Sequence, residues 1–391
     1  MTQSVAPRTA FIPQVESLRG VAALVVVLYH LFETRAVDQH TFDAPNLDQL
    51  ANFALTMLFN GTGAVMLFFV ISGYVLGCNV LPDSTLTVLF YAKFAIRRIF
   101  RIMPALWLSL VVAVVLLVFY HHQSVTRGAL LNAAFLGKDA LRFNGPLWSL
   151  QIEMAISALY PLLLFANFRF GLFAQLAALA ILSLITYSNN DPVAWKNYLF
   201  CFQLGIMVPS AGKMLIEALK PQLTFPVFLV ALAGIMTPTN LSHLGYLSMT
   251  EHALIEGFSG FVILSYILHA DCPRLNSLLR SRLARFIGMI SYSLYLLHLP
   301  ISDVLNNLVP RVLNLSIDYQ NWGILFRLAM VPVVVTVCAA AAWISYRIIE
   351  APFHELGRRL AGMLNRGAFA PQRTAVLPSI PSTRPELETS T

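Results

Sequence analysis

Long apolar runs recur along almost the whole chain, separated by short polar breaks that carry glycine, proline or charged residues. Most runs approach the roughly 20 residues that one helix needs to cross the hydrocarbon core of a bilayer. The pattern therefore predicts an all-α fold, a polytopic membrane bundle of about ten transmembrane helices. The expected spans are 15–33, 55–78, 103–120, 147–167, 170–187, 195–211, 223–238, 253–270, 286–306 and 324–347. The range 223–238 is short, and 125–140 is a candidate for a segment that enters the membrane without crossing it.

Composition supports a membrane protein over the soluble classes. The length of 391 residues would suit two soluble domains, but hydrophobic residues make up 57% of the chain and charged residues 12%. A soluble domain usually has about 25% charged residues. The mean hydropathy is +0.69. A soluble enzyme, a fibrous protein and a disordered chain are therefore poor fits.

The basic residues predict the orientation, because Lys and Arg are kept out of translocated loops. Every second loop and the C-terminal end carry most of them, which predicts that both termini are cytoplasmic. The net charge of +7 then reflects membrane sidedness, not nucleic-acid binding. The loop with Arg127, Lys138 and Arg142 is a partial exception. The basic side comprises Lys93, Arg97, Arg98, Arg101, Lys213, Lys220, Arg274, Arg280, Arg282, Arg285, Arg347, Arg358, Arg359 and Arg366.

One membrane domain accounts for most of the chain. We expect a cytoplasmic N-terminal tail at 1–14, the bundle at 15–353, a cytoplasmic basic segment at 354–369 and a disordered tail rich in Pro, Ser and Thr at 370–391. The N-terminus lacks the features of a cleaved signal peptide, so the first apolar segment is expected to stay as a membrane helix. The cysteines lack paired or metal-like spacing and are predicted to be buried free thiols, with no metal site. They are Cys78, Cys201, Cys272 and Cys338.

Ionisable residues inside the spans are the first candidates for chemistry, because each is costly in a membrane unless it is paired or faces a polar cavity. Arg19 and His30 lie eleven positions apart on the first span. Eleven helical steps return to within about 20° of the same face after a rise of about 16 Å. The two side chains therefore share one stripe, near opposite ends of the helix. An Arg that reaches lipid phosphates and a His that bonds a carbonyl would explain them equally well.

Other polar groups have functional and structural interpretations. Arg97, Arg98 and Arg101 lie within about one helical turn, where they could grip phosphates; a positive-inside anchor is favoured. Glu153 needs a partner inside its apolar run and lies one turn after Ser149.

Three more groups are more ambiguous. The small residues Ser72 and Gly73 predict a helix-packing face. Ser291, Tyr295 and His298 share a face that suits a polar seam as well as a substrate contact. Glu350 is expected to pair with an Arg of the basic loops.

Taken together, these segments resemble acyltransferase family 3 of membrane acyltransferases, in the same order over nearly the whole chain. The segments are ESLRGVAALVVVLYH, LFFVISGY, RRIFRIMPALW, PLWSLQIE, CFQLGI, ISYSLYLLHLP and IIEAPF. The resemblance implies a bundle of about ten helices in the bacterial inner (cytoplasmic) membrane. It implies transfer of an acyl group, often acetyl, from cytoplasmic acetyl-CoA or another acyl-CoA to a sugar hydroxyl. The acceptors are commonly exported glycans, such as lipopolysaccharide, peptidoglycan, capsule or exopolysaccharide.

The family's residues map onto this chain by their motifs. The Arg and His of the first helix correspond to Arg19 and His30, and the Trp-Ser-x-x-x-Glu element corresponds to Trp148, Ser149 and Glu153. The resemblance thus implies a catalytic centre with His30 as general base, together with Arg19 and Glu153. The residues implied in binding the acyl-CoA are Arg97, Arg98, Arg101, Ser72, Trp148 and Ser149.

The chain departs from the family pattern in two ways. The usual acidic residue of the second helix is missing, since Ala64, Val65 and Met66 are uncharged, and ESLR replaces a frequent Asp-Gly-Leu-Arg form. Some relatives have an extra hydrolase-like domain after the bundle; we find none in this sequence and expect the bundle to act alone or with a separate partner.

Two further questions stay open at this point. General-base catalysis and an acyl-imidazole intermediate on His30 both fit the residues. A transporter or flippase for a lipid-linked sugar is the rival function, with Arg19, His30 and Glu153 along its pathway. A signalling or scaffold protein would not need three ionisable groups in the membrane. The expected partners are the acyl-CoA, a glycan or glycoside and the bilayer, with no nucleic acid; self-association is left open.

Overall fold

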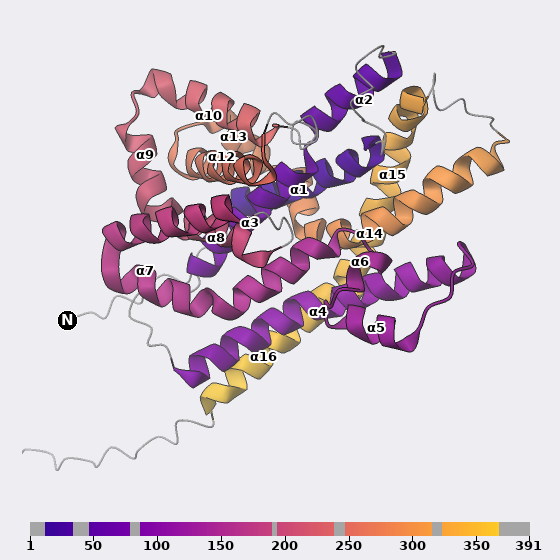
Figure 1. Ribbon diagram of the computed structural model, residues 1–391, viewed down its shortest axis with the longest axis horizontal. Coiled ribbons are helices and arrows are strands. Elements are labelled where there is room, and N and C mark those ends of the chain that lie inside the picture. Colours follow the sequence, from indigo (N-terminus) through magenta and orange to yellow (C-terminus); the bar gives the residue numbers. More distant parts are fainter. Residues whose placement is uncertain are drawn as a thin grey trace, which may run out of the picture.

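The computed structural model describes residues 12–33, 47–78, 87–189, 194–237, 247–314 and 323–366. Every regular element in these ranges is a helix, which confirms the all-α class (Figure 1). The elements are α1 (Pro13–Phe32), α2 (Leu47–Leu58), α3 (Gly61–Cys78), α4 (Val88–Phe119), α5 (Arg127–Ala134), α6 (Ala140–Phe143), α7 (Leu147–Ser188), η2 (Trp195–Tyr198), α8 (Leu199–Met207), η3 (Val208–Gly212), α9 (Lys213–Ala218), α10 (Pro221–Ile235), α12 (Met249–His269), α13 (Pro273–Leu279), α14 (Arg282–Val312), α15 (Gly323–Ser345), η4 (Tyr346–Glu350) and α16 (Ala351–Arg366).

Eight helical stretches in the described ranges are long and apolar enough to cross a membrane, which indicates an integral membrane protein. They are Pro13–Phe32, Asp48–Cys78, Val88–Phe119, Leu147–Asn167, Arg169–Ser188, Trp195–Ala218, Met249–His269 and Gly323–Leu364. The other two expected spans also form helices. The helix α10 has only 15 residues, and α14 is not among the eight because polar residues interrupt its apolar run. Ten membrane crossings and cytoplasmic termini therefore stay predictions.

Several expected segments can be compared with the observed helices. The segment 125–140 forms α5 and the start of α6, two short helices. Helix α16 continues past the expected end of the bundle at 353 and reaches Arg366. The predicted tails at 1–14 and 370–391 lie outside the described residues, apart from 12–14. Cys201 and Cys338 are buried free thiols as predicted, whereas the free thiols of Cys78 and Cys272 are partly exposed, because they lie near helix ends.

Local signals explain where several helices start and turn. Pro13 begins α1, where its missing N–H costs no hydrogen bond. The side chains of Thr87 and Ser248 cap α4 and α12 by accepting hydrogen bonds from backbone N–H groups. Gly171 has a φ of 74°, which few other residues adopt. The chain turns back at this glycine, so that α7 forms two arms (Figure 1).

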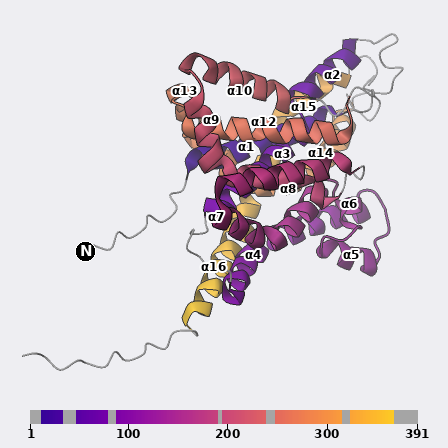
Figure 2. The same ribbon diagram turned by 60° about the vertical axis from the view of Figure 1, so that its left-hand side comes forward.

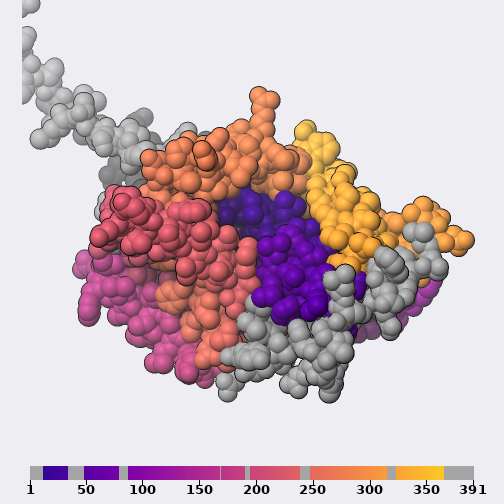
Figure 3. Space-filling view, turned by 90° about the horizontal axis from the view of Figure 1, so that it is seen from above, coloured from indigo at the N-terminus to yellow at the C-terminus, as the bar shows by residue number. Residues whose placement is uncertain are grey.

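Helix α1 lies at the centre of the arrangement, packed against α14, α3 and α15. Seen from above, the part of α1 that reaches the surface is surrounded by later segments of the chain (Figure 3). The closest approach is to α14 at Gly20 and Gly288, where a Cβ atom on Gly20 would lie 2.5–2.9 Å from backbone atoms of Ile287 and Gly288. Only glycine allows this contact, which sets Arg19 and His30 against α14.

The change Gly20→Val is expected to destabilise the bundle, because its side chain cannot enter the contact with α14 without moving backbone atoms. Overpacking of this kind costs about 1–3 kcal/mol. Thermal unfolding of the purified protein in detergent measures the loss. The control is Gly362→Val in α16, where a Cβ atom meets nothing within 4 Å. Equal melting temperatures for the two variants would contradict the close packing.

Two further helix pairs complete the framework. A Cβ atom on Gly73 would lie 2.8 Å from the Cα atom of Phe202, so Gly73 packs closely against α8 as predicted, whereas the hydroxyl of Ser72 bonds to Glu153 of α7. Helices α4 and α16 run side by side in both views (Figures 1 and 2). Helix α16 thereby packs along α4, the helix that carries the predicted arginine cluster.

Candidate active site

Two cavities lie at opposite ends of α1, and both are also lined by α4 and α14. The histidine cavity, of about 520 Å³, contains His30 and Glu33 from the end of α1. The arginine cavity, of about 440 Å³, contains Glu16 and Arg19 from its beginning. The two residues of the stripe deduced from the sequence therefore line different cavities, His30 the histidine cavity and Arg19 the arginine cavity. Neither side chain points only at lipid.

Hydrogen bonds fix the imidazole of His30. Its Nδ1 lies 2.9 Å from the carbonyl oxygen of Val26. Because a carbonyl can only accept, we assign the proton to Nδ1, which leaves a lone pair on Nε2. His298 is assigned in the same way, since its Nδ1 lies 2.7 Å from the carbonyl oxygen of Tyr295. Its Nε2 then faces Nδ1 of His30 at 3.3 Å and supports the same tautomer.

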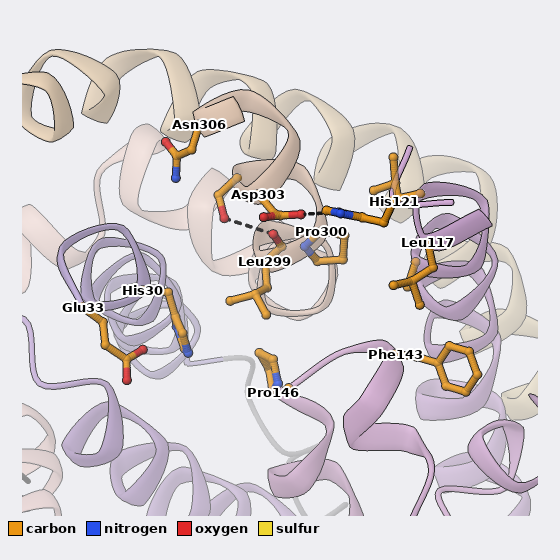
Figure 4. A pocket seen from close by; sticks show the side chains of 14 residues that line it. His30, Glu33, Leu117, His121, Phe143, Pro146, Leu299, Pro300, Asp303 and Asn306 are labelled. Atoms are coloured by element: carbon orange, nitrogen blue, oxygen red, sulfur yellow. Dashed lines mark hydrogen bonds and ion pairs between the residues drawn. The ribbon is translucent and has the colours of Figure 1, made fainter. Parts of the chain in front are cut away.

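Polar groups from α14 and from the turn after α4 line the space beside His30 (Figure 4). His121 and Asp303 form an ion pair with 2.7 Å between Nε2 and Oδ2. Asn306 lines the same cavity, and its side-chain oxygen has no hydrogen-bond partner among the described residues. Carboxylate and amide oxygens of this kind accept hydrogen bonds from hydroxyl groups. The cavity is thus suited to a ligand that carries several hydroxyls.

The arginine cavity combines Arg19 and Arg101 with Glu16 and Glu350. Glu350 accepts a hydrogen bond from Ser293, with 3.0 Å between Oγ and Oε2. The described residues include no ion pair to Glu350, although both arginines line the same cavity, so the expected pairing with an arginine of the basic loops is replaced by this bond within the bundle. Two guanidinium groups at one cavity wall can bind an anion such as a phosphate.

The predicted arginine cluster is divided among three environments. The Arg98 side chain is 9% exposed and donates hydrogen bonds to Glu153 and, at 2.9 Å from Nε, to Oγ of Ser157. Arg101 lines the arginine cavity, whereas Arg97 is exposed. Within about one turn of α4, Arg98 therefore faces an acidic partner, Arg101 faces the arginine cavity and Arg97 faces away from the protein.

Glu153 lies in the interior of the bundle as the sequence indicated, with Arg98 as its partner. Ser72 also donates to Glu153, with 3.3 Å between Oγ and Oε1. No hydrogen bond joins Glu153 to His30 in the described part of the chain. Ser72, Arg98 and Glu153 thus form one polar cluster that connects α3, α4 and α7.

Tyr295 lies between the levels of the two cavities. Along α14 it follows Ser291 of the arginine cavity by one turn and precedes His298 by about one turn. Its hydroxyl lies 2.7 Å from Oγ of Ser149 and 3.0 Å from the carbonyl oxygen of Pro146. The predicted polar seam of α14 therefore contacts the start of α7, and its phenol group lies between the arginine end and His30.

The sequence did not predict the aromatic contacts of Trp148 or the polar residues beside His30. Trp148 packs against Phe69 and Tyr198, with ring centroids 6.5 and 5.8 Å apart. Asp303 falls inside the predicted span 286–306, so the criterion that selected Glu153 would also have found it. His121 lies just after the end of α4, where polar residues are common, and Asn306 lies inside α14, where no pattern along the chain marks it.

Comparisons with known proteins agree with this architecture. A family model described as an acyltransferase domain matches residues 12–345. The putative peptidoglycan O-acetyltransferase YrhL of Bacillus subtilis is 24% identical, and the match covers 89% of this chain and 56% of that protein. The peptidoglycan O-acetyltransferase OatA of Listeria monocytogenes is 23% identical with the same coverage. The O-acetyltransferase OatA of Staphylococcus aureus is 25% identical, over 95% of this chain and 62% of that protein.

The chain therefore spans less than two thirds of the length of these relatives. No solved structure matches it.

Proposed function

We propose the function of this chain from the premise that it belongs to acyltransferase family 3, since the family model matches residues 12–345, well over half of its length. The family resemblance seen in the sequence is thereby confirmed. The proposed activity is transfer of an acetyl group from acetyl-CoA to a hydroxyl group of a sugar in an exported or cell-surface glycan. The names of the relatives, which include peptidoglycan O-acetyltransferases, support the acetyl group and the glycan. The proposed location is the bacterial inner (cytoplasmic) membrane.

One observation carries this proposal. His30 presents an imidazole whose Nδ1–H is held by the Val26 carbonyl, so that Nε2 is the basic atom, at a cavity rich in polar groups. A neutral imidazole is the common general base of acyl transfer. The same helix carries Arg19 at a second cavity, where an anionic donor can bind. Donor and acceptor would thus approach from opposite ends of one helix.

The proposed reaction proceeds at Nε2 of His30. The acceptor hydroxyl attacks the thioester carbonyl carbon, and its proton passes to Nε2 as the new C–O bond forms. The C–S bond then breaks, and the imidazolium returns the proton to the thiolate. The products are an acetylated sugar and free coenzyme A, and the histidine is regenerated. Asn306 and the pair of His121 and Asp303 would hold other hydroxyls of the sugar.

The donor is proposed to bind from the cytoplasm with its phosphates at Arg19 and Arg101. Its long flexible arm must then pass the level of Tyr295 to bring the thioester to His30. The cytoplasmic assignment rests on the distribution of basic residues, because Arg101 lies in one of the basic segments between predicted spans.

Label transfer tests the proposed function. The purified protein in lipid vesicles is incubated with acetyl-CoA that carries a labelled acetyl group and with glycans from a bacterial cell envelope. We expect label in the glycan that mild alkali releases, as it does from an ester. Movement of a lipid-linked sugar across the vesicle membrane without label in the glycan would support the transporter and would contradict the enzyme.

The change Arg101→Gln is expected to raise the KM for acetyl-CoA about tenfold or more, because it removes a charge-assisted phosphate contact worth about 1.5–3 kcal/mol. The value of kcat should change much less, since Arg101 lines the arginine cavity, at the other end of α1 from His30. Initial rates at varied acetyl-CoA measure both constants. The control is Arg359→Gln, whose exposed guanidinium pairs with Glu355 on α16. A large fall in kcat at an unchanged KM for Arg101→Gln would contradict the donor site.

A further inference from the structure

A third cavity, of about 250 Å³, shares no lining residue with the histidine and arginine cavities. We call it the glutamate cavity. Its walls come from the start of α3, both ends of α7, η2 and the first two turns of α12. The lining residues used below are Thr62, Trp148, Asn197, Tyr198, Thr250 and Glu256.

Glu256 is the unusual residue of this cavity, because it is fully buried and only half of its carboxyl group is bonded. Its Oε1 accepts hydrogen bonds from Nδ2 of Asn60 at 2.5 Å and from Oγ1 of Thr62 at 2.8 Å. Nδ1 of His252 lies 3.5 Å from the same oxygen. The other oxygen, Oε2, has no hydrogen-bond partner among the described residues. A buried acceptor without a donor costs free energy. A ligand that donates a hydrogen bond to Oε2 would recover that free energy on binding.

The remaining lining indicates the chemical class of that ligand. Trp148 and Tyr198 form an aromatic wall, with ring centroids 5.8 Å apart. Thr62, Thr250 and Asn197 add hydroxyl and amide groups. Among the described residues, no Lys or Arg lines the cavity, which argues against a phosphate or another anion. A neutral ring with apolar C–H faces and several hydroxyl donors, which is a sugar unit, fits this combination.

The glutamate cavity and the histidine cavity have walls that lie close together along the chain. Pro146 lines the histidine cavity and Trp148 lines the glutamate cavity, so only the first turn of α7 separates the two. On the other side, Gly61 packs against the ring of Tyr29, the neighbour of His30, and Thr62 follows in the glutamate cavity. Successive units of one oligosaccharide can therefore occupy both spaces.

We propose that the glutamate cavity is a second acceptor subsite, which binds a neutral sugar unit next to the unit that is acetylated at His30. The inference rests on the proposed function and makes it more specific: the acceptor is an oligosaccharide or polysaccharide and not a single sugar. Glu256 binds a sugar hydroxyl through Oε2, and Trp148 and Tyr198 cover one face of the ring.

The test compares N-acetylglucosamine with its β-1,4-linked tetramer as acceptors. Wild-type protein is expected to show a kcat/KM at least tenfold higher for the tetramer than for the monomer. In Glu256→Gln, an amide N–H₂ replaces the accepting oxygen with little change in shape, and this preference is expected to fall about tenfold. The control is Glu217→Gln, whose exposed side chain pairs with Lys213 on α9 and should keep the preference. If Glu256→Gln does not fold, Thr250→Val removes a hydroxyl from the same cavity and should lower the preference in the same direction.

Binding of the tetramer, followed by tryptophan fluorescence, separates this inference from the proposed function. We expect the Kd of the tetramer to rise about tenfold in the folded Glu256→Gln or Thr250→Val protein. If wild-type protein acetylates both acceptors equally well, or if the variants bind the tetramer as tightly as wild type, the subsite is wrong and the acetyltransferase stands. If no glycan is acetylated but the Kd still rises in the variants, the proposed function fails and the sugar site stands.

Discussion

Replacing His30 by alanine is expected to lower kcat for acetyl transfer by about a hundred- to ten-thousandfold, the range that general bases contribute. The acceptor hydroxyl then loses the group that takes its proton, while both cavities keep their other walls. The KM for acetyl-CoA should change little, because the arginine cavity lies at the other end of α1. Single-turnover transfer to a cell-envelope glycan measures the chemical step separately from product release.

Two controls make the result specific to the imidazole. His122→Ala changes an exposed histidine that follows His121 along the chain and does not line the histidine cavity, and it should keep normal transfer. Thermal unfolding of His30→Ala should match wild type closely, since the side chain makes its main hydrogen bond within its own helix. Normal transfer by folded His30→Ala protein would remove the base from the mechanism, whatever the acceptor.

The position of His30 illustrates how far the sequence could predict the site. Helical periodicity alone placed Arg19 and His30 on one stripe, and the structure places them at cavities at opposite ends of α1. The reason is that spacing along one helix depends only on its 3.6-residue repeat. Their roles in donor binding and proton transfer stay predictions.

Contacts between helices could not be predicted in this way. The sequence showed that Glu153 needs a partner but did not choose among several arginines and histidines, and packing of α4 against α7 selects Arg98. The contact between His298 and His30 likewise depends on the close approach of α1 and α14 at two glycines. A face of a helix follows from the sequence, whereas its neighbour follows from the packing of the whole bundle.

The same limit explains why the sequence predicted ten spans, whereas eight helical stretches in the described ranges are long and apolar enough to cross a membrane. Apolar length found the helical regions, including α10 and α14, because burial and lipid exposure both favour apolar residues. It could not tell that α14 turns its serines, Tyr295 and His298 toward other helices. A helix surrounded by protein tolerates polar groups that a lipid-facing helix does not.

The change Glu153→Gln is expected to destabilise the bundle by about 3 kcal/mol or more, because it leaves the guanidinium of Arg98 buried without its counter-charge. Chemical or thermal unfolding in detergent measures the loss. The double variant Arg98→Met/Glu153→Gln removes both charges and should regain most of the stability, since an apolar side chain of similar length fills the space. No recovery in the double variant would show that Arg98 and Glu153 do not act as a pair.

Activity of the double variant then tests whether Glu153 has a direct part in the reaction, as the family resemblance implies. Glu153 bonds to Arg98 and Ser72 and lines neither the histidine nor the arginine cavity. We therefore expect the stable double variant to keep a measurable rate of transfer, with its largest change in the KM for acetyl-CoA, because Arg98 lies one turn from Arg101. A double variant as stable as wild type but as inactive as His30→Ala would instead place the carboxylate of Glu153 among the reacting groups.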